Sequence, residues 1–244
     1  MKRKVTLPLA LIVGIGVSAA AIQGLHAQTR KAFTITDVEM LDKAAYEALV
    51  KAVAPDIQKA GGQGLNTTLG KIVSLTGQPP KAVIIIQWDS LEKAEAYLKS
   101  PTYTNLIPQR DKAYKIIRGY IVEAGPNFTG FTLQGQKPKA YWIRELEVIN
   151  QAALDDLPNA IRAISGLPEQ IQEASRQAGR QATATANGKV VARVGEAPKK
   201  FALQGFSSLE QAEAFIKSPA NTRTLPLLDK AEKITRQYIV EAAQ

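Results

Sequence analysis

Few side-chain types in this chain are available for chemistry. Its 244 residues include no cysteine and one histidine, His26, which lies in a segment that we expect to be removed. The remaining chain can form neither a Ser-His-Asp nor a Cys-His nucleophile system. It also has no ligands for a Cys/His zinc site or for a haem bound through His or Cys. A carboxylate, Tyr, Lys or Arg must carry any chemistry, and the sequence assigns no catalytic residue, metal ligand or cofactor.

Arg110 and two tyrosines are candidates for ligand binding. The planar guanidinium of Arg110 suits a carboxylate. The hydroxyls of Tyr46 and Tyr103 can form hydrogen bonds with a ligand. Each candidate has a structural alternative. Arg110 can pair with a nearby acid, Asp111 or Glu95, on a helix surface, and each tyrosine can be a core residue with one satisfied hydrogen bond.

Four further candidates have mainly structural interpretations. Asp42 stands where a helix cap belongs, because its carboxylate can accept from exposed backbone N–H groups. Gly61 and Gly62 predict the end of a helix rather than a cradle for an anion. Trp88 ends an apolar strand, where it either lines a pocket or fills the core. Phe206 at the paired position favours core filling.

The first 27 residues read as a secretory signal peptide. A basic start at residues 2–4 precedes an apolar run over residues 5–21 and a group of small residues. We expect cleavage after Ala27, with Ala21 as the alternative, and an uncleaved membrane anchor is the rival interpretation. The sequence therefore predicts a bacterial periplasmic or secreted protein that has no stable association with the membrane after cleavage.

The charge of the chain does not point to nucleic acid. The formal net charge of +9 falls to +6 when the three basic residues of the signal peptide are removed. Residues 31–124 carry 12 basic and 10 acidic groups, and residues 139–242 carry 14 and 12, so each segment has a charge of +2. This is a mixed, solvated surface rather than a basic stripe. We expect no nucleic-acid partner.

The chain contains one unit written twice. Residues 90–124 align without a gap with residues 208–242, and 22 of the 35 positions are identical. The offset there is 118, whereas the repeat starts at residues 31 and 139 with an offset of 108. Copy two therefore carries ten extra residues, which we expect to lengthen its first helix and loop around residues 158–179.

On this basis we divide the chain into a signal peptide (residues 1–27), copy one (28–124), a linker (125–138) and a degenerate copy two (139–244). The linker assignment follows from its content of Gly, Pro, Gln and Thr. A pseudo-dimer within one chain results, and the sequence does not determine whether it associates further.

Each copy predicts the order β-α-β-β-α-β, which is a ferredoxin-like pattern. In copy one we predict strands over residues 32–40, 63–76, 82–88 and 119–124, with helices starting near residue 43 and at residue 91, and a further helix after Pro101 that ends near residue 117. Such a unit has helices on one face of its sheet only. The two copies are expected to cover each other's open face, sheet against sheet. The predicted fold class is α+β, an intramolecular dimeric α/β barrel of tandem ferredoxin-like repeats.

The motifs of copy one resemble a known bacterial family. They comprise Asp42-Lys43-Ala44-Ala45-Tyr46, Gly61-Gly62, Trp88 with Ser90-Leu91 and Ala94, Ser100-Pro101-Thr102-Tyr103, and Arg110 with Ala113. In order and spacing they are similar to the domain of unknown function 1330 family, which belongs to the dimeric α/β-barrel superfamily. The resemblance implies that superfamily's fold and no particular activity. It covers residues 31–124 directly and residues 139–242 through the repeat.

The resemblance places the family's recurrent residues at Asp42, Tyr46, Gly61, Gly62, Tyr103 and Arg110. Copy two departs from this set: Leu154 replaces the first tyrosine, Asn221 the second, and Leu228 the arginine. If the pattern marks a pocket, copy one alone retains it. Relatives in the superfamily include cofactor-independent monooxygenases, haem-dependent enzymes and small-molecule binders, and the haem branch depends on a His that this chain lacks.

Three functions remain open from the sequence. The favoured one is an exported soluble protein that binds a small organic molecule at or beside the junction of the repeats, where ligands commonly bind. The second is a cofactor-independent enzyme, monooxygenase-like or isomerase-like, that uses Arg110, Tyr46 or Asp42. The third is a structural or interaction protein without a ligand.

Overall fold

The computed structural model describes most of the chain beyond the predicted signal peptide, which lies outside the described residues. Those residues are 30–126, 128–131, 137–180, 183–186 and 189–243. Within them, no helix combines the length and the apolar character that crossing a bilayer requires.

Ten strands form two five-stranded antiparallel sheets. The first sheet contains β1 (Ala32–Met40), β2 (Gly62–Gly64), β4 (Ala82–Trp88), β5 (Tyr114–Glu123) and β8 (Val190–Val194). The second contains β3 (Ile72–Thr76), β6 (Ala140–Val148), β7 (Thr183–Ala186), β9 (Lys200–Phe206) and β10 (Glu232–Glu241). The strand orders are β2-β4-β1-β5-β8 and β3-β10-β6-β9-β7. The two sheets therefore have the same arrangement, as the internal repeat predicts.

Each copy gives one edge strand to the other copy's sheet. Strand β3 of copy one pairs with β10, opposing Val73 to Ile239. Strand β8 of copy two pairs with β5, opposing Val191 to Ile121. The prediction of one strand over residues 63–76 is therefore wrong. That segment forms β2 in the first sheet and β3 in the second, because the chain crosses from one sheet to the other over residues 66–70. Gly70 permits a close backbone contact at this crossover, since a Cβ there would lie 1.6 Å from the Glu241 carbonyl oxygen.

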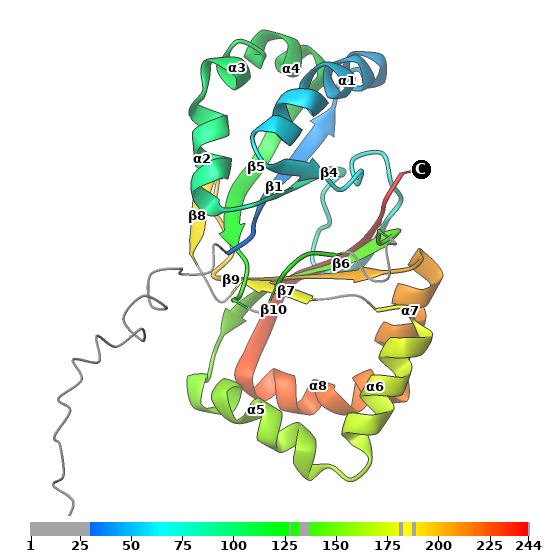
Figure 1. Ribbon diagram of the computed structural model, residues 1–244. Coiled ribbons are helices and arrows are strands. Elements are labelled where there is room, and N and C mark those ends of the chain that lie inside the picture. Colours follow the sequence, from blue (N-terminus) through cyan, green and yellow to red (C-terminus); the bar gives the residue numbers. More distant parts are fainter. Residues whose placement is uncertain (1–29, 127, 132–136, 181–182, 187–188, 244) are drawn as a thin grey trace, which may run out of the picture.

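Helices cover the outer face of each sheet, so the molecule has four layers (Figure 1). The helices of copy one are α1 (Lys43–Lys59), α2 (Leu91–Lys99), α3 (Pro101–Thr104) and α4 (Ile107–Ala113). Those of copy two are α5 (Gln151–Ala163), α6 (Leu167–Gln177), α7 (Leu209–Lys217) and α8 (Pro219–Ala231). The predicted caps of the first helices are confirmed. Asp42 accepts from the Ala45 amide at 2.9 Å, and Asn150 accepts from the Ala153 amide at 3.1 Å.

Two predicted helix boundaries are wrong. The last helix of copy one ends at Ala113 rather than near residue 117, and β5 begins at Tyr114, where it pairs with Met40 of β1. Strand pairing thus outweighs the local helical pattern at Tyr114. The extra residues of copy two do not lengthen its first helix. They form the separate helix α6, which follows Gly166 in the left-handed conformation at a φ of +69°.

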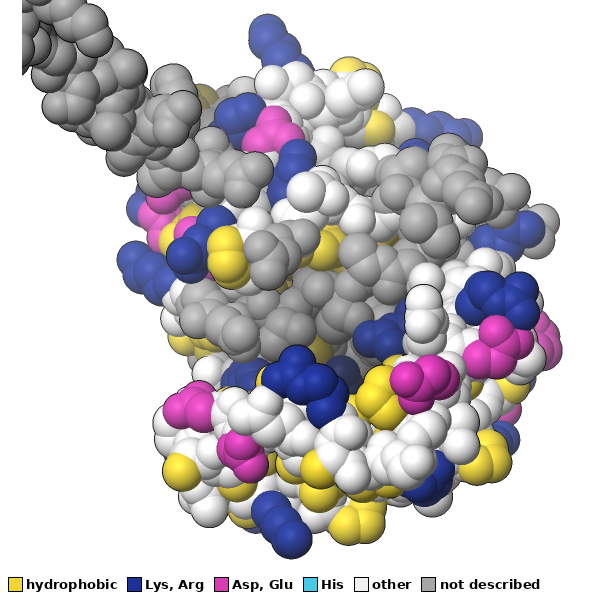
Figure 2. Space-filling model, turned by 60° about the horizontal axis from the view of Figure 1, so that its bottom comes forward, with side chains coloured by type: hydrophobic (Ala, Val, Ile, Leu, Met, Phe, Trp, Pro, Cys, Tyr) yellow, Lys and Arg dark blue, Asp and Glu magenta, His cyan; other side chains and the backbone are white. Residues whose placement is uncertain are grey.

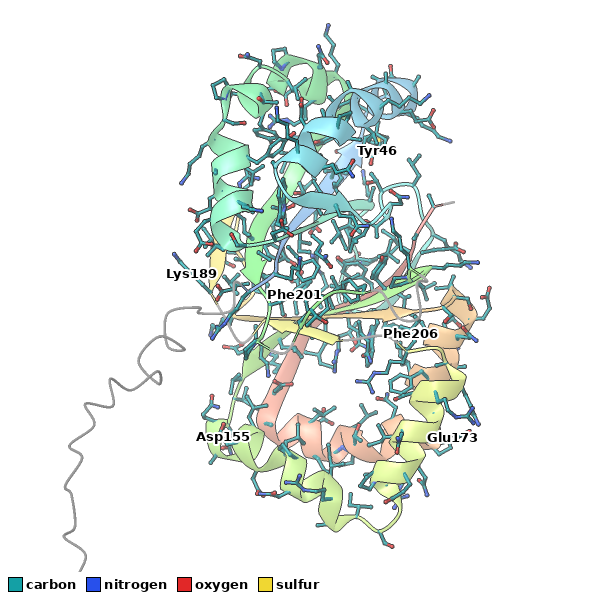
Figure 3. The ribbon with its side chains drawn as sticks, in the orientation of Figure 1. Tyr46, Asp155, Glu173, Lys189, Phe201 and Phe206 are labelled. Carbon is teal, nitrogen blue, oxygen red and sulfur yellow. The ribbon has the colours of Figure 1, made fainter. Side chains whose placement is uncertain are left out.

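The main hydrophobic core lies between the two sheets and draws on both copies. The first sheet contributes Phe33, Ile35, Val83, Ile85, Tyr120 and Val122, and the second contributes Tyr141, Ile143, Phe201, Leu203, Tyr238 and Val240. Figure 3 shows Phe201 among the side chains that fill this layer. The predicted packing of sheet against sheet is confirmed. Burial of these alternating apolar positions is the main force that joins the copies.

The predicted linker also contributes to this core. Phe128 and Phe131, both buried, pack against each other with ring centroids 4.9 Å apart. Their rings also contact Phe33 of copy one, at 5.5 and 5.7 Å, and Phe131 contacts Tyr141 of copy two at 5.4 Å. The segment between the repeats is therefore part of the interface that it connects.

Candidate functional site

A cavity of about 730 Å³ lies in copy one, between the outer face of the first sheet and the helices α1 to α4. Its floor is formed by alternate residues of three strands: Thr34, Thr36, Ile84, Ile86 and Ile116. Side chains at every second position point to one face of a sheet, and their neighbours Phe33, Ile35, Val83 and Ile85 fill the core on the other face. The core fills most of the space between the sheets, and this cavity lies on the other face of the first sheet.

The helices place a mainly apolar wall over this floor. From α1 come Leu49, Val53, Ala54 and Ile57, and Leu98 and Leu106 add to them from α2 and the turn before α4. The amphipathic pattern of α1 explains this arrangement, because its apolar positions recur at helical spacing. The cavity therefore suits a ligand whose larger part is apolar.

Arg110 and Tyr103 form a polar pair on the helix side of the cavity. The Arg110 Nη1 donates to the Tyr103 hydroxyl oxygen at 3.0 Å, while Nε and Nη2 donate to Asp111 Oδ1 at 2.9 and 2.7 Å. Burial alone would lower the pKa of Arg110, but the hydrogen bonds to Asp111 and Tyr103 raise it above its ordinary value. The guanidinium is charged and held in one orientation. The predicted ion pair with Asp111 is present, and Arg110 also lines the cavity.

Tyr46 and Tyr114 lie together at the α1 end of the cavity, with ring centroids 6.1 Å apart. The Tyr46 hydroxyl donates to Thr68 Oγ1 at 2.6 Å. Figure 3 shows Tyr46 on α1 above the first sheet. Burial raises the pKa of both phenols. They are therefore neutral at physiological pH and act as hydrogen-bonding groups rather than as bases.

The rim of the cavity carries positive charge from both copies. Lys31, Lys137 and Arg193 line it, and Arg193 belongs to β8, the strand that copy two gives to the first sheet. Asp89, also at the rim, accepts from Lys31 at 2.9 Å and from Lys93 at 2.7 Å. These hydrogen bonds lower the pKa of Asp89 below its ordinary value. The rim thus favours an anionic ligand.

The structure brings together five of the seven candidate residues from the sequence. Those that line the cavity are Tyr46, Gly61, Gly62, Tyr103 and Arg110. Asp42 does not line it, because this exposed residue caps α1. Trp88 is fully buried beneath it and donates from Nε1 to Thr34 Oγ1 at 3.2 Å. Trp88 therefore fills the core, as its counterpart Phe206 indicates.

The two glycines have distinct structural roles. Gly61 ends α1 with a φ of +84°, a conformation that side chains disfavour. A Cβ on Gly62 would lie 2.7 Å from both the Trp88 ring and Ile57. The left-handed conformation of Gly61 and the close contacts at Gly62 explain why glycine occupies both positions, without a role in binding an anion.

Sequence reasoning missed several residues that line the cavity. Thr34 and Thr36 could have been found from the alternation of polar and apolar residues in their strand. Tyr97 could have been found from its place on the apolar face of its helix. Tyr114 was obscured by the predicted helix. Arg193 reaches the site only through the exchange of β8, for which the sequence carries no local signal. Within the described part of the chain, no group of three or more His, Cys, Asp or Glu side chains is placed to hold a metal ion.

Two antiparallel sheets packed face to face, each with helices on its outer side, define a dimeric α/β barrel within one chain. Residues 31–124, which hold the cavity, match the family described as "Domain of unknown function (DUF1330)". Copy one is therefore a DUF1330 domain. No curated protein matches the chain.

Solved structures with little sequence identity share the fold of nearly the whole chain. A presumed chlorite dismutase is 8% identical with a TM-score of 0.54, over 89% of this chain and 96% of that one. A dye-decolorizing peroxidase from Bacteroides thetaiotaomicron VPI-5482 is 6% identical with a TM-score of 0.52, over 88% and 94% of the two chains. A heme-binding protein from Thermus thermophilus is 11% identical with a TM-score of 0.51, over 88% and 92%. At these identities the likeness concerns the fold alone.

Proposed function

We propose that the cavity of copy one binds a small organic molecule with an apolar body and a carboxylate. The observation that carries the proposal is the Arg110–Tyr103 pair, fixed at 3.0 Å opposite the apolar α1 wall in a cavity of about 730 Å³. The apolar body packs on the isoleucines of β4 and β5, and the carboxylate lies toward Arg110. Lys31, Lys137 and Arg193 attract the ligand to the mouth.

The protonation states favour binding over acid–base catalysis. A general base works best when its pKa lies near the working pH. Burial raises the pKa of Tyr46 and Tyr114, which makes each phenol a poorer base. Asp89 has a lowered pKa and is held by two lysines at the rim. We therefore rank binding above a monooxygenase-like or isomerase-like reaction.

The cavity residues do not fit a haem, although two of the structures with this fold are named as a heme-binding protein and a dye-decolorizing peroxidase. Haem iron takes His, Cys, Met or Tyr as its axial ligand. Among the described residues that line the cavity, tyrosine alone is of these types. The raised pKa of Tyr46 and Tyr114 opposes the phenolate that iron binding needs.

Calorimetric titration of the purified full chain with benzoate and hexanoate tests the proposal. We expect binding of at least one, and about tenfold or greater weakening in Arg110→Ala, because a charge-assisted hydrogen bond is lost. Arg162→Ala, which removes an exposed arginine of copy two, is the charge-matched control and should bind like the wild type. Absence of binding by both acids, or equal affinity of Arg110→Ala and wild type, would refute the proposal.

We also propose that residues 1–27 direct export. Their basic start, apolar run and group of small residues support this. Expression of the full chain in a bacterium, followed by fractionation and mass spectrometry, should give a periplasmic or secreted product that begins at Gln28 or Ile22. A product that retains Met1 and stays in the cytoplasm or membrane would contradict export and cleavage.

A further inference from the structure

A partly buried arginine without a partner lies on the helix-facing side of the second sheet. Arg144 of β6 has its Nε fully buried and without a hydrogen-bond acceptor. Among the residues that the structure describes, its guanidinium forms neither a hydrogen bond nor an ion pair. It lies 4.2 Å from the centroid of the Trp142 ring, two positions earlier on the same strand face. A buried donor without an acceptor is rare in folded proteins and requires a physical explanation.

A second guanidinium, that of Arg180, lies near Arg144. Arg180 stands 5.2 Å from the Phe215 ring centroid and donates from Nη1 to Ser175 Oγ at 3.0 Å. The Gln204 side-chain amide lies directly beside the same guanidinium. Burial lowers the pKa of Arg144 to about 10, and the positive charge of Arg180 adds to this effect. The two cations are therefore close enough to repel each other.

The carboxylate nearest to Arg144 in the described part of the chain is already paired with another cation. In the described part of the chain, Glu232 is the acid whose field raises the pKa of Arg144. The Glu232 carboxylate of β10, itself buried, forms an ion pair with Lys200 of β9, across the intervening strand β6. Among the described residues, this pairing leaves the Arg144 guanidinium without a carboxylate of its own. Figure 2, which views the molecule from the side of the copy-two helices, shows Lys and Arg side chains interspersed with Asp and Glu side chains over this face.

The two copies carry an arginine at different places in the layer between sheet and helices. Arg144 occupies the position of Thr36, which lies on the floor of the copy-one cavity. Leu228 of copy two occupies the position of Arg110, on the helix side. Copy two has therefore lost the arginine on its helix and gained one on its sheet. This exchange distinguishes a second site from a merely degenerate copy.

We propose that the space between the second sheet and its helices is a separate site for a small oxyanion, carboxylate or phosphate, which binds Arg144 over the Trp142 ring with Arg180 beside it. The planar guanidinium of Arg144 offers donors in the fork geometry that matches two oxygens of either group. The anion supplies the acceptor and the negative charge that Arg144 lacks among the described residues. This site is independent of the ligand proposed for copy one.

Titration of the full chain with succinate and with inorganic phosphate, at constant ionic strength in chloride, tests this site and separates the two ligand classes. The test variant is Arg144→Thr, which installs the residue that copy one carries at the paired position. We expect at least tenfold weaker binding of the preferred anion, whereas Arg162→Ala should stay within twofold of wild type. Arg144→Lys keeps the charge but loses the fork, and we expect a several-fold weakening that remains measurable if the threonine variant does not fold.

Thermal unfolding gives a second test, in which the substitution is expected to preserve or raise the Tm although it weakens anion binding. In chloride alone, we expect Arg144→Thr to have a Tm equal to or above that of wild type, because an uncompensated charge is removed. The preferred anion should then raise the Tm of wild type and not that of the variant. Failure of both anions to bind, equal affinity of Arg144→Thr and wild type, or a lower Tm of Arg144→Thr in chloride would each overturn the proposal. None of these results bears on Arg110 and the copy-one cavity.

Discussion

Arg236 of copy two donates a hydrogen bond from Nη1 to Oδ2 of Asp37 in copy one, over a distance of 2.7 Å. Arg236 also donates to Glu145, at 3.1 Å from Nε and 2.5 Å from Nη2, and Arg118 of copy one donates to the same carboxylate. The internal repeat pairs Asp37 with Glu145 and Arg118 with Arg236. The same acid and base therefore meet from both copies between the sheets, where the two acids are 5% and 2% exposed.

Removal of one base from this cluster should destabilise the fold strongly. We expect Arg236→Met to lower the free energy of unfolding by about 3–5 kcal/mol, because Asp37 and Glu145 stay buried with Arg118 as their one remaining ion-pair partner among the described residues. The control is Arg176→Met, which breaks the exposed ion pair with Glu173 and should cost about 1 kcal/mol or less. Urea denaturation of the three proteins measures both effects. Similar losses in the two variants would contradict a buried role for Arg236.

The stability contributed by Asp37 should depend on pH. Burial raises the pKa of its carboxyl above the ordinary value of 3.8 and outweighs the lowering by Arg236 and Arg118. The folded state then binds the proton more tightly than the unfolded state, so this contribution is complete below pH 3.8 and is lost as the pH rises through the folded-state pKa. We expect the unfolding free energy of wild type minus that of Asp37→Asn to fall as the pH rises from about 3.5 to 7. Urea titrations across this range measure the difference, and a constant or rising difference would contradict the sign.

Local patterns predicted the parts of the fold that depend on neighbouring residues. The alternation of residues 32–40, the apolar run of residues 82–88 and the caps Asp42 and Asn150 each act within a few positions of the chain. The packing of sheet on sheet could be predicted because one layer of helices covers only one face of each sheet, and the other face must be buried against something. Both kinds of inference need no knowledge of distant contacts.

The exchanged strands could not be predicted in this way. The segment of residues 72–76 has the same alternation whether it pairs within copy one or with β10 of copy two. Which partner strand it pairs with depends on contacts between residues about 165 positions apart, and the local alternation of apolar residues carries no information about such contacts. For the same reason the sequence placed Phe128 and Phe131 in a linker and gave Arg193 no role at the cavity.

Substitution of Gly62 should test how closely the floor of the cavity is packed. A Cβ on Gly62 meets the Trp88 ring and Ile57 at 2.7 Å, whereas a Cβ on Gly64 of the same strand meets no atom within 4 Å. We expect Gly62→Ala to lower the free energy of unfolding by about 1–3 kcal/mol through overpacking. Gly64→Ala should change it by less than about 0.5 kcal/mol. Chemical denaturation compares the two, and equal stabilities would show that Trp88 moves aside at little cost.

The segment between the repeats should prove to be part of the core rather than a tether. Phe131 is 5% exposed and contacts aromatic rings of both copies, so Phe131→Ala should lower the free energy of unfolding by about 3–5 kcal/mol through lost burial and the cavity left behind. Thr129→Ala, at an exposed position two residues earlier, should stay within about 0.5 kcal/mol of wild type. Urea denaturation followed by tryptophan fluorescence measures both, because Trp88 and Trp142 report on the first and second sheets respectively. We expect the two tryptophans to lose their native signal in one transition, since the aromatic cluster joins the copies. A variant Phe131→Ala as stable as Thr129→Ala would show that the sheets hold together without this segment.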